Sequence, residues 1–291
     1  MLIHTLKISL LAVLCSVISF AADAQKVQEP QNLSPEWSQP YAPFRIAGNL
    51  YYVGTYDLAC YLVTTPKGHI LINTGLAASA KTIKASVEAL GFKFADIKIL
   101  LTTQAHYDHM GAMAAIKKMT GATMMADEKD AQVMADGGSS DYALGGAGKT
   151  YQPLKADRLL HDKDTVILAD MNLVMLHHPG HTKGSCSFLF DVKDKERSYK
   201  VLIANMPSIV TEKKFSEVTA YPEIEADYAY TFSQMKTLSF DIWLSSHASQ
   251  FGLHKKHQPG DAYRPSAFME RAGYDAALRD LQLQYDKKIA H

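Results

Sequence analysis

The sequence is poor in several features that would place it in other classes of protein. Only three of its 291 residues are cysteine, and beyond residue 24 no apolar run is long enough to span a bilayer. Thirty basic residues balance 30 acidic ones, which argues against a nucleic-acid footprint or a polybasic membrane patch. No Gly-rich phosphate loop follows the first predicted strand, and this disfavours a nucleotide-binding fold. These absences leave a small molecule as the expected partner.

Residues 1–24 have the three parts of an export signal. Lys7 supplies a positive charge, residues 8–20 are apolar, and residues 22–24 read Ala-Asp-Ala, a small-x-small cleavage site. The apolar run is too short for a transmembrane helix. We therefore predict cleavage after Ala24 and a periplasmic mature protein.

The cysteines do not change this prediction. Cys15 would be the anchor of a lipoprotein, but Leu14 precedes it where a small residue is expected. Cys60 and Cys186 remain in the mature chain, and export permits a disulfide, but two cysteines so far apart in sequence do not establish one. We expect two small, mostly buried side chains, and the sequence leaves their redox state open.

Apolar runs and turn signals predict strands followed by helices, an order that occurs twice along the chain. The predicted strands cover residues 49–53, 59–64, 69–72, 97–101, 123–126, 165–168, 173–177, 186–190, 200–204 and 242–245. The predicted helices cover residues 77–90, 110–118, 127–135, 227–238 and 265–291. Two sheets packed face to face with helices outside would satisfy this order. We expect a single domain over residues 25–291.

Two segments are predicted to lie over the surface of this domain. Residues 25–43 are rich in Pro, Gln and Ser and read as an extended arm, which Trp37 would pin by packing. Residues 137–148 combine many glycines with small polar residues, which is typical of a mobile loop. This Gly-rich loop is either a lid or a disordered tip, and our hypothesis is a flap over the substrate.

The most informative stretch is residues 103–109, which read Thr-Gln-Ala-His-Tyr-Asp-His. They place His106, Asp108 and His109 on a loop between the end of a predicted buried strand and the start of a predicted helix. Imidazole nitrogen and carboxylate oxygen are ligands that zinc takes from proteins, and a catalytic zinc site leaves a position open for water. An isolated motif of this kind is as often an ordinary polar turn, so the rest of the chain has to decide.

Two further histidines also follow predicted strands. His181 lies in a turn fixed by Pro and Gly, and His247 follows the last predicted strand. Loops at one rim of a sheet converge on one cleft, which is the geometry that a metal centre needs. Of the adjacent His177 and His178, at most one can face the cleft, because neighbours along a strand point to opposite faces. The conjunction of these loops predicts a zinc site.

These residues resemble the subclass B3 metallo-β-lactamases, and within them the GOB-type branch. The resemblance extends from residues 43–54 to the last predicted helix. Its most specific pieces are residues 104–109, Gly137 and Gly138 with Asp141, residues 178–182, and residues 246–247. It implies the four-layer αβ/βα sandwich of this superfamily, with a metal cleft at the rim of the two sheets.

The resemblance also implies two sets of zinc ligands, carried over position by position. The first set consists of Gln104, His106 and His181. The second set consists of Asp108, His109 and His247. Most of the superfamily has histidine where Gln104 stands, and a neutral amide oxygen is a weaker zinc donor than imidazole. The GOB-type enzymes share this glutamine, so we expect one firmly bound Zn²⁺ in the second site and up to two in all.

Other positions refine the implied function. Ser208 matches a position that contacts the substrate carboxylate in relatives, and Asn73 replaces the usual aspartate of its turn, where we expect a structural role behind the ligands. Glyoxalase II and related hydrolases place a bridging aspartate near the stretch that matches residues 204–208, which has no carboxylate here. Within that stretch Met206 is expected to form an apolar wall. This departure disfavours thioester or phosphodiester hydrolysis.

The implied reaction is hydrolysis of the β-lactam amide of penicillins, cephalosporins and carbapenems, which confers antibiotic resistance. Zinc lowers the pKa of bound water towards ~7, and Asp108 would orient that water and pass on a proton, without a covalent intermediate. A lactonase or thioesterase with the same metal site is one alternative. A non-enzymatic periplasmic zinc-binding protein is another, although it would be expected to close the coordination sphere. We expect a monomer without nucleic-acid or membrane partners.

Overall fold

The structure is a computed structural model that describes residues 26–290. The predicted export signal and the cleavage after Ala24 lie outside the described residues. Within residues 26–290, no helix has the length and apolar character needed to cross a membrane.

The first sheet has seven strands in the order β1-β2-β3-β4-β5-β6-β7. They are β1 (Phe44–Ala47), β2 (Leu50–Tyr52), β3 (Tyr61–Thr65), β4 (Gly68–Ile72), β5 (Ile97–Leu101), β6 (Thr123–Asp127) and β7 (Arg158–Leu160). Strands β1 to β4 pair antiparallel, and β4 to β7 pair parallel. The change occurs where helical crossovers replace tight turns, because parallel neighbours cannot be joined by a hairpin.

The second sheet has five strands in the order β12-β11-β10-β9-β8. They are β8 (Thr165–Leu168), β9 (Met171–His177), β10 (Cys186–Lys193), β11 (Ser198–Ala204) and β12 (Ile242–Ser245). All neighbours pair antiparallel except β11 and β12, which are parallel.

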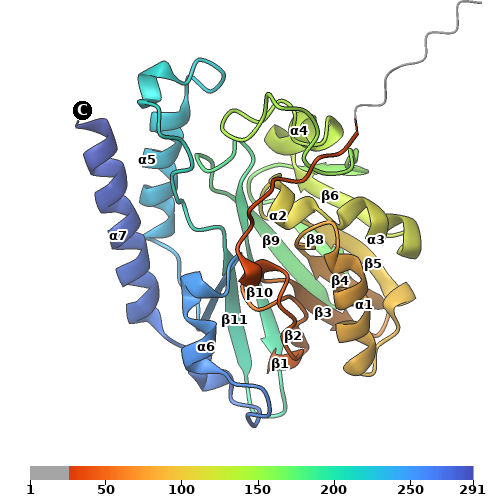
Figure 1. Ribbon diagram of the computed structural model, residues 1–291. Helices are drawn as coiled ribbons and strands as arrows, with labels where there is room; N and C mark the ends of the chain where they lie inside the picture. The colour runs from red at the N-terminus through yellow and green to blue at the C-terminus, as the bar shows by residue number, and fades with distance from the viewer. Residues whose placement is uncertain (1–25, 291) are drawn as a thin grey trace, which may run out of the picture.

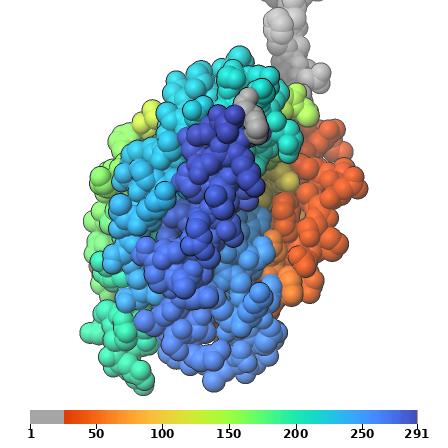
Figure 2. All heavy atoms as spheres, turned by 90° about the vertical axis from the view of Figure 1, so that its left-hand side faces the viewer, coloured from red at the N-terminus to blue at the C-terminus, as the bar shows by residue number. Residues whose placement is uncertain are grey.

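Helices cover the outer face of each sheet (Figure 1). They are α1 (Ser79–Ala89), α2 (Tyr107–Met110), α3 (Met113–Thr120), α4 (Ala131–Ala135), α5 (Ile224–Met235), α6 (Leu253–Lys256) and α7 (Arg271–Ile289). Helices α1 and α3 lie outside the first sheet, and α5 and α7 lie outside the second. Figure 2 shows α7 along the surface of that second side. The order helix, sheet, sheet, helix confirms the predicted αβ/βα sandwich.

Two apolar clusters fill the spaces between these layers. Tyr61 and Val63 of β3 belong to the larger cluster, whereas Leu62 belongs to the cluster under α1 and α3. Consecutive side chains of a strand point to opposite faces, so β3 contributes to both clusters. All five residues of β4 are buried, because both faces of this sheet are covered. Cys60 and Cys186 are buried, as expected, and both are free thiols.

The structure differs from the sequence-based prediction at short or punctuated elements. Strand β7 and helix α6 were not predicted, since three or four residues are too few to show a periodic pattern. The predicted helix 127–135 divides into a 3₁₀ turn, η3 (Glu128–Asp130), and α4. The tail helix begins at Arg271, because Pro265 opens a separate 3₁₀ turn, η6 (Pro265–Phe268).

A partly buried hydrogen bond joins the two sheets near their edges. Asp127 at the end of β6 lies 2.6 Å from the Nδ1 atom of His177 at the end of β9. Burial alone would lower the pKa of His177, but the bond to Asp127 outweighs burial and raises it. A histidine whose folded pKa is raised stabilises the fold below its unfolded pKa of about 6.5, and this stabilisation is lost as pH rises through the folded value.

We predict that His177→Gln lowers the free energy of unfolding by about 1 to 2 kcal/mol at mildly acidic pH and by less at alkaline pH. Urea unfolding of both proteins at about pH 6 and about pH 9 measures the difference. His161→Gln is the control, since that side chain is 64% exposed and forms only a surface pair with Glu128. A His177→Gln effect of the same size at both pH values would contradict the prediction.

Candidate metal centre

The structure brings the six predicted ligands to one rim of the sandwich. Residues 104–109 follow β5 and enter α2, His181 lies between β9 and β10, and His247 follows β12. The rings of His106 and His181 are 4.9 Å apart, and those of His109 and His247 are 5.2 Å apart. Loops from both sheets therefore meet at this rim.

Asp108, His109 and His247 form the tighter group. One potential ligand atom from each of them lies within 4.8 Å of the others. The Asp108 Oδ2 atom is 3.3 Å from Nε2 of His109 and 3.3 Å from Nε2 of His247. Burial would raise the pKa of Asp108, but the two imidazoles hold it well below its usual range. An anionic carboxylate between two imidazole nitrogens is a donor set that suits zinc.

Gln104 has the property expected of a metal ligand. Its side-chain oxygen is buried and has no hydrogen-bond partner among residues 26–290. A buried acceptor without a partner costs about 1 to 3 kcal/mol, and a metal ion bound to this oxygen would remove that cost. The residues present therefore fit a metal at the first set of ligands as well as at the second.

Three of the predicted ligands, His106, His181 and His247, come from three different loops. In each of them, one ring nitrogen is hydrogen-bonded to an oxygen acceptor. His106 Nε2 lies 3.3 Å from Asp141 Oδ2, His181 Nδ1 lies 2.8 Å from the carbonyl oxygen of Ser208, and His247 Nδ1 lies 3.0 Å from Asp57 Oδ2. Carboxylates and carbonyls only accept, so these ring nitrogens donate. In the neutral form of each ring the lone pair is then on the other nitrogen, where a metal can bind once any further proton has left.

Asp57 is a residue beside the site that the sequence analysis missed. Besides His247, it accepts hydrogen bonds from the Trp37 indole (3.1 Å) and the Ser249 backbone N–H (2.9 Å). Burial would raise the pKa of Asp57, but the bonds from His247 and Ser249 lower it strongly. Burial would likewise lower the pKa of His247, but Asp108 and Asp57 raise it to about 9. No periodic pattern or strand end marks this aspartate in the sequence.

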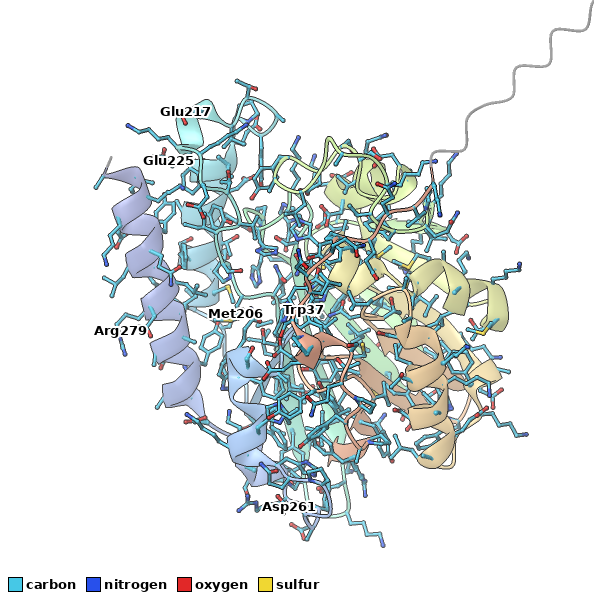
Figure 3. All side chains as sticks on the ribbon, in the orientation of Figure 1. Trp37, Met206, Glu217, Glu225, Asp261 and Arg279 are labelled. Carbon is cyan, nitrogen blue, oxygen red and sulfur yellow. The ribbon has the colours of Figure 1, made fainter. Side chains whose placement is uncertain are left out.

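The N-terminal arm contributes to the same wall of the site. Trp37 ends the 3₁₀ turn η1 (Pro35–Trp37), and its ring centre is 5.6 Å from that of His247 and 6.2 Å from that of Tyr107. Figure 3 shows Trp37 between the helices of the first sheet and those of the second. Packing of this tryptophan pins the arm, as predicted.

The Gly-rich loop of residues 137–148 is attached to the site at two points. Asp141 contacts His106, and the Tyr142 hydroxyl donates to the carbonyl oxygens of Gly180 and His181 at 3.0 and 3.2 Å. Gly137 has a φ of +71°, and a Cβ there would lie 2.5 Å from the Tyr151 carbonyl oxygen, so this glycine is required by backbone shape and close approach. That this loop is a flap remains a prediction. Its contacts at Asp141 and Tyr142 attach it to the loops that carry His106 and His181.

The remaining predicted positions lie around the ligands. Ser208 holds His181 through its carbonyl, and its Oγ atom is 3.1 Å from His181 Nδ1. Asn73 accepts the Thr103 N–H at 2.9 Å and so supports the start of the ligand loop from behind. His178 bonds to Ser187, and His177 bonds to Asp127, so neither belongs to the cluster.

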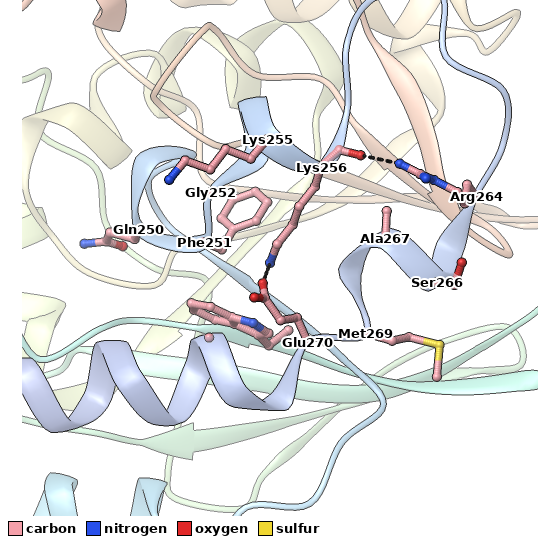
Figure 4. Close-up of a pocket in the computed structure, with 12 residues that line it drawn as sticks. Gln250, Phe251, Gly252, Lys255, Lys256, Arg264, Ser266, Ala267, Met269 and Glu270 are labelled. Atoms are coloured by element: carbon pink, nitrogen blue, oxygen red, sulfur yellow. Dashed lines mark hydrogen bonds and ion pairs between the residues drawn. The ribbon is translucent and has the colours of Figure 1, made fainter.

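A separate cavity of about 610 Å³ lies under α6, η6 and the start of α7 (Figure 4). Lys256 crosses it and pairs with Glu270 at 2.9 Å, and Arg264 donates to the Lys256 carbonyl. None of the six predicted ligands lines this cavity. The candidate site is therefore the cluster at the rim.

The chain is similar to a known family and to proteins of known structure. The metallo-β-lactamase superfamily model matches residues 54–194. The chain is similar to the class B3 di-zinc metallo-β-lactamase LRA-12 from an Alaskan soil metagenome, at 69% identity over 90% of this chain and 99% of that one, with a TM-score of 0.89. It is similar to the metallo-β-lactamase GOB-18 from Elizabethkingia meningoseptica, at 58% identity over 92% and 99% of the two chains, with a TM-score of 0.91.

A more distant curated relative is the N-acyl homoserine lactonase AttM from Azorhizobium caulinodans, 29% identical over 157 residues, or 44% of this chain. The chain spans about half the length of the curated relatives that it matches, 57% in this case.

We predict that Asp57→Asn lowers zinc affinity at the set containing His247 by about 10- to 100-fold, since His247 loses its charged acceptor. Competition with a chromophoric chelator measures the affinity. Asp157→Asn is the matched control, because Asp157 also accepts a backbone N–H, that of Met124, and no hydrogen bond joins it to a candidate ligand. Equal affinities in the two variants would contradict the prediction.

Proposed function

The chain belongs to the class B3 branch of the metallo-β-lactamase superfamily, and we propose that it hydrolyses the β-lactam amide bond of penicillins, cephalosporins and carbapenems with zinc. The observation that carries this proposal is the pair of ligand sets at one rim, Asp108 with His109 and His247 beside His106 with His181. Gln104 at the first metal-motif position agrees with the GOB-type branch. The proposed role is resistance to these antibiotics.

We propose that His109, His247 and Asp108 hold one zinc firmly, and that Gln104 completes a weaker site with His106 and His181. The unpartnered oxygen of Gln104 supports this role. The difference in strength follows from the donors, because an amide oxygen binds zinc less well than imidazole. The protein then carries one zinc or two, depending on the zinc concentration.

Asp108 is the residue proposed to transfer the proton of the attacking water. When bound, zinc supplies a Lewis acid and makes water more acidic. The carboxylate is anionic at neutral pH, since His109 and His247 lower its pKa against the effect of burial. It accepts a hydrogen bond from the attacking water and passes the proton to the departing amide nitrogen. Ser208, half-buried next to His181, is proposed to contact the substrate carboxylate.

A lactonase is the alternative that a specific observation raises, because AttM shares part of its sequence with this chain. The stretch of residues 204–208 supports the β-lactamase assignment instead. It has the neutral, buried Asn205 and Met206 and lacks the carboxylate with which superfamily relatives bridge two metals. A panel of β-lactams, lactones and thioesters separates the two activities.

We further propose that the protein acts in the periplasm as a monomer, after cleavage following Ala24. The composition of residues 1–24 supports export. N-terminal sequencing of the periplasmic fraction tests the cleavage site, and Gln25 is the expected first residue.

The first experiment is carbapenem hydrolysis by the mature protein before and after chelation, with zinc counted on the same sample. We expect chelation to abolish hydrolysis and added zinc to restore it, because the attacking water depends on the metal. Bound zinc without turnover of any β-lactam would overturn the proposed reaction while leaving the metal site intact.

Gln104→His tests the assignment of the weaker site. Replacing the amide oxygen by an imidazole nitrogen is expected to raise zinc affinity at that site at least about tenfold and to leave the firm site unchanged. Stepwise zinc titration of both proteins against a chelator measures the two constants. If neither constant changes, Gln104 is not a ligand.

A further inference from the structure

A buried aspartate behind the site joins two of the ligand loops. Asp130 ends the turn η3 and is 1% exposed. Its Oδ2 atom accepts the Ala105 backbone N–H at 2.9 Å and the Thr182 hydroxyl at 2.8 Å. Its Oδ1 atom accepts the Gly184 N–H at 2.8 Å. All three donors therefore come from ligand loops, and none comes from a ligand side chain.

The position of these donors links Asp130 to one set of ligands. Ala105 lies between Gln104 and His106, and Thr182 directly follows His181. The three residues of the proposed weaker site thus come from the two segments that Asp130 holds together. The firm site has supports of its own, because Asp57 holds His247 and the Thr74 hydroxyl donates to the His109 carbonyl at 2.9 Å.

Residue 184 of the His181 turn packs closely against Asp130. A Cβ at position 184 would lie 2.4 Å from the Asp130 backbone nitrogen and 2.8 Å from its Cγ, so only glycine lets the His181 turn come this close. Three donors converge on two oxygens, and an amide in this place would turn its own N–H groups toward donors. Burial raises the pKa of Asp130 to about 6, so above that pH the group is a carboxylate and accepts only.

We propose that Asp130 is a positioning residue that sets the metal affinity of the first site, by fixing the separation between the Gln104–His106 segment and His181. The inference rests on the ligand assignment of the proposed function. In this proposal Asp130, which is not itself a ligand, controls whether the protein carries one zinc or two.

Asp130→Asn in the full mature protein tests this proposal, and Asp127→Asn is the matched control. Asp127 is also buried, at 2% exposure, also precedes α4, and also accepts a backbone N–H, that of Lys129. Its other partner is His177, and no hydrogen bond joins it to a ligand loop. Both variants lose one buried carboxylate, so loss of stability alone affects both.

The readout is the pair of zinc dissociation constants from competition titration, with the weaker step identified as the one that Gln104→His strengthens. We expect Asp130→Asn to weaken that step by about 10- to 100-fold and to leave the firm step unchanged. Asp127→Asn should change neither constant. Equal losses at both sites, no loss, or the same loss in Asp127→Asn would overturn the proposal.

Thr182→Val is the second variant, for the case in which Asp130→Asn does not fold. It keeps Asp130 and removes only the hydroxyl that ties the carboxylate to the His181 turn, so the weaker step should again be affected alone. If the unchanged protein binds no second zinc, the ligand assignment itself fails, and this inference fails with it. If it binds two zinc ions and hydrolyses β-lactams, but neither Asp130→Asn nor Thr182→Val changes the weaker step, only the inference fails.

Discussion

The site depends on hydrogen-bond acceptors that decide where the histidine protons lie. His106, His181 and His247 come from different loops, and each gives the proton of one ring nitrogen to an oxygen behind it. In the neutral form of each ring, the lone pair is then on the other nitrogen. These hydrogen bonds fix the orientation of the rings, so metal binding need not supply that cost.

The histidines and Asp108 that meet at the rim were predictable from the sequence because their loops follow apolar runs that read as strands, whereas Gln104 was indicated only by the family resemblance. Their supports were not. Asp57 lies 190 residues from His247, in a turn without a periodic pattern, and only the meeting of the two sheets brings them together. Asp130 was assigned to a helix, where an aspartate reads as a solvated side chain, although it is 1% exposed. Long-range hydrogen bonds of this kind leave no local mark in a sequence.

The fold shows the same division between local and long-range information. Strands such as β4 and β5 were placed correctly because their apolar runs are bounded by turn residues. The loop of residues 137–148 was interpreted as mobile from its glycines and small polar residues. In the structure, Gly137 and Gly138 have positive φ and approach the chain at residues 150–151 closely. Glycine gives a backbone conformational freedom in some loops and permits close packing in others. Only the tertiary structure distinguishes these two roles.

The position of Trp37 has a consequence for optical spectroscopy. The sequence has two tryptophans. The Trp37 ring lies tilted against that of His247, and its indole N–H donates to Asp57. Trp243 is buried beside the distant cavity under α6. The fluorescence of Trp37 therefore reports charge and occupancy at the rim, whereas Trp243 reports the core. The protein carries an intrinsic emission probe at its metal centre, with a second chromophore as an internal reference.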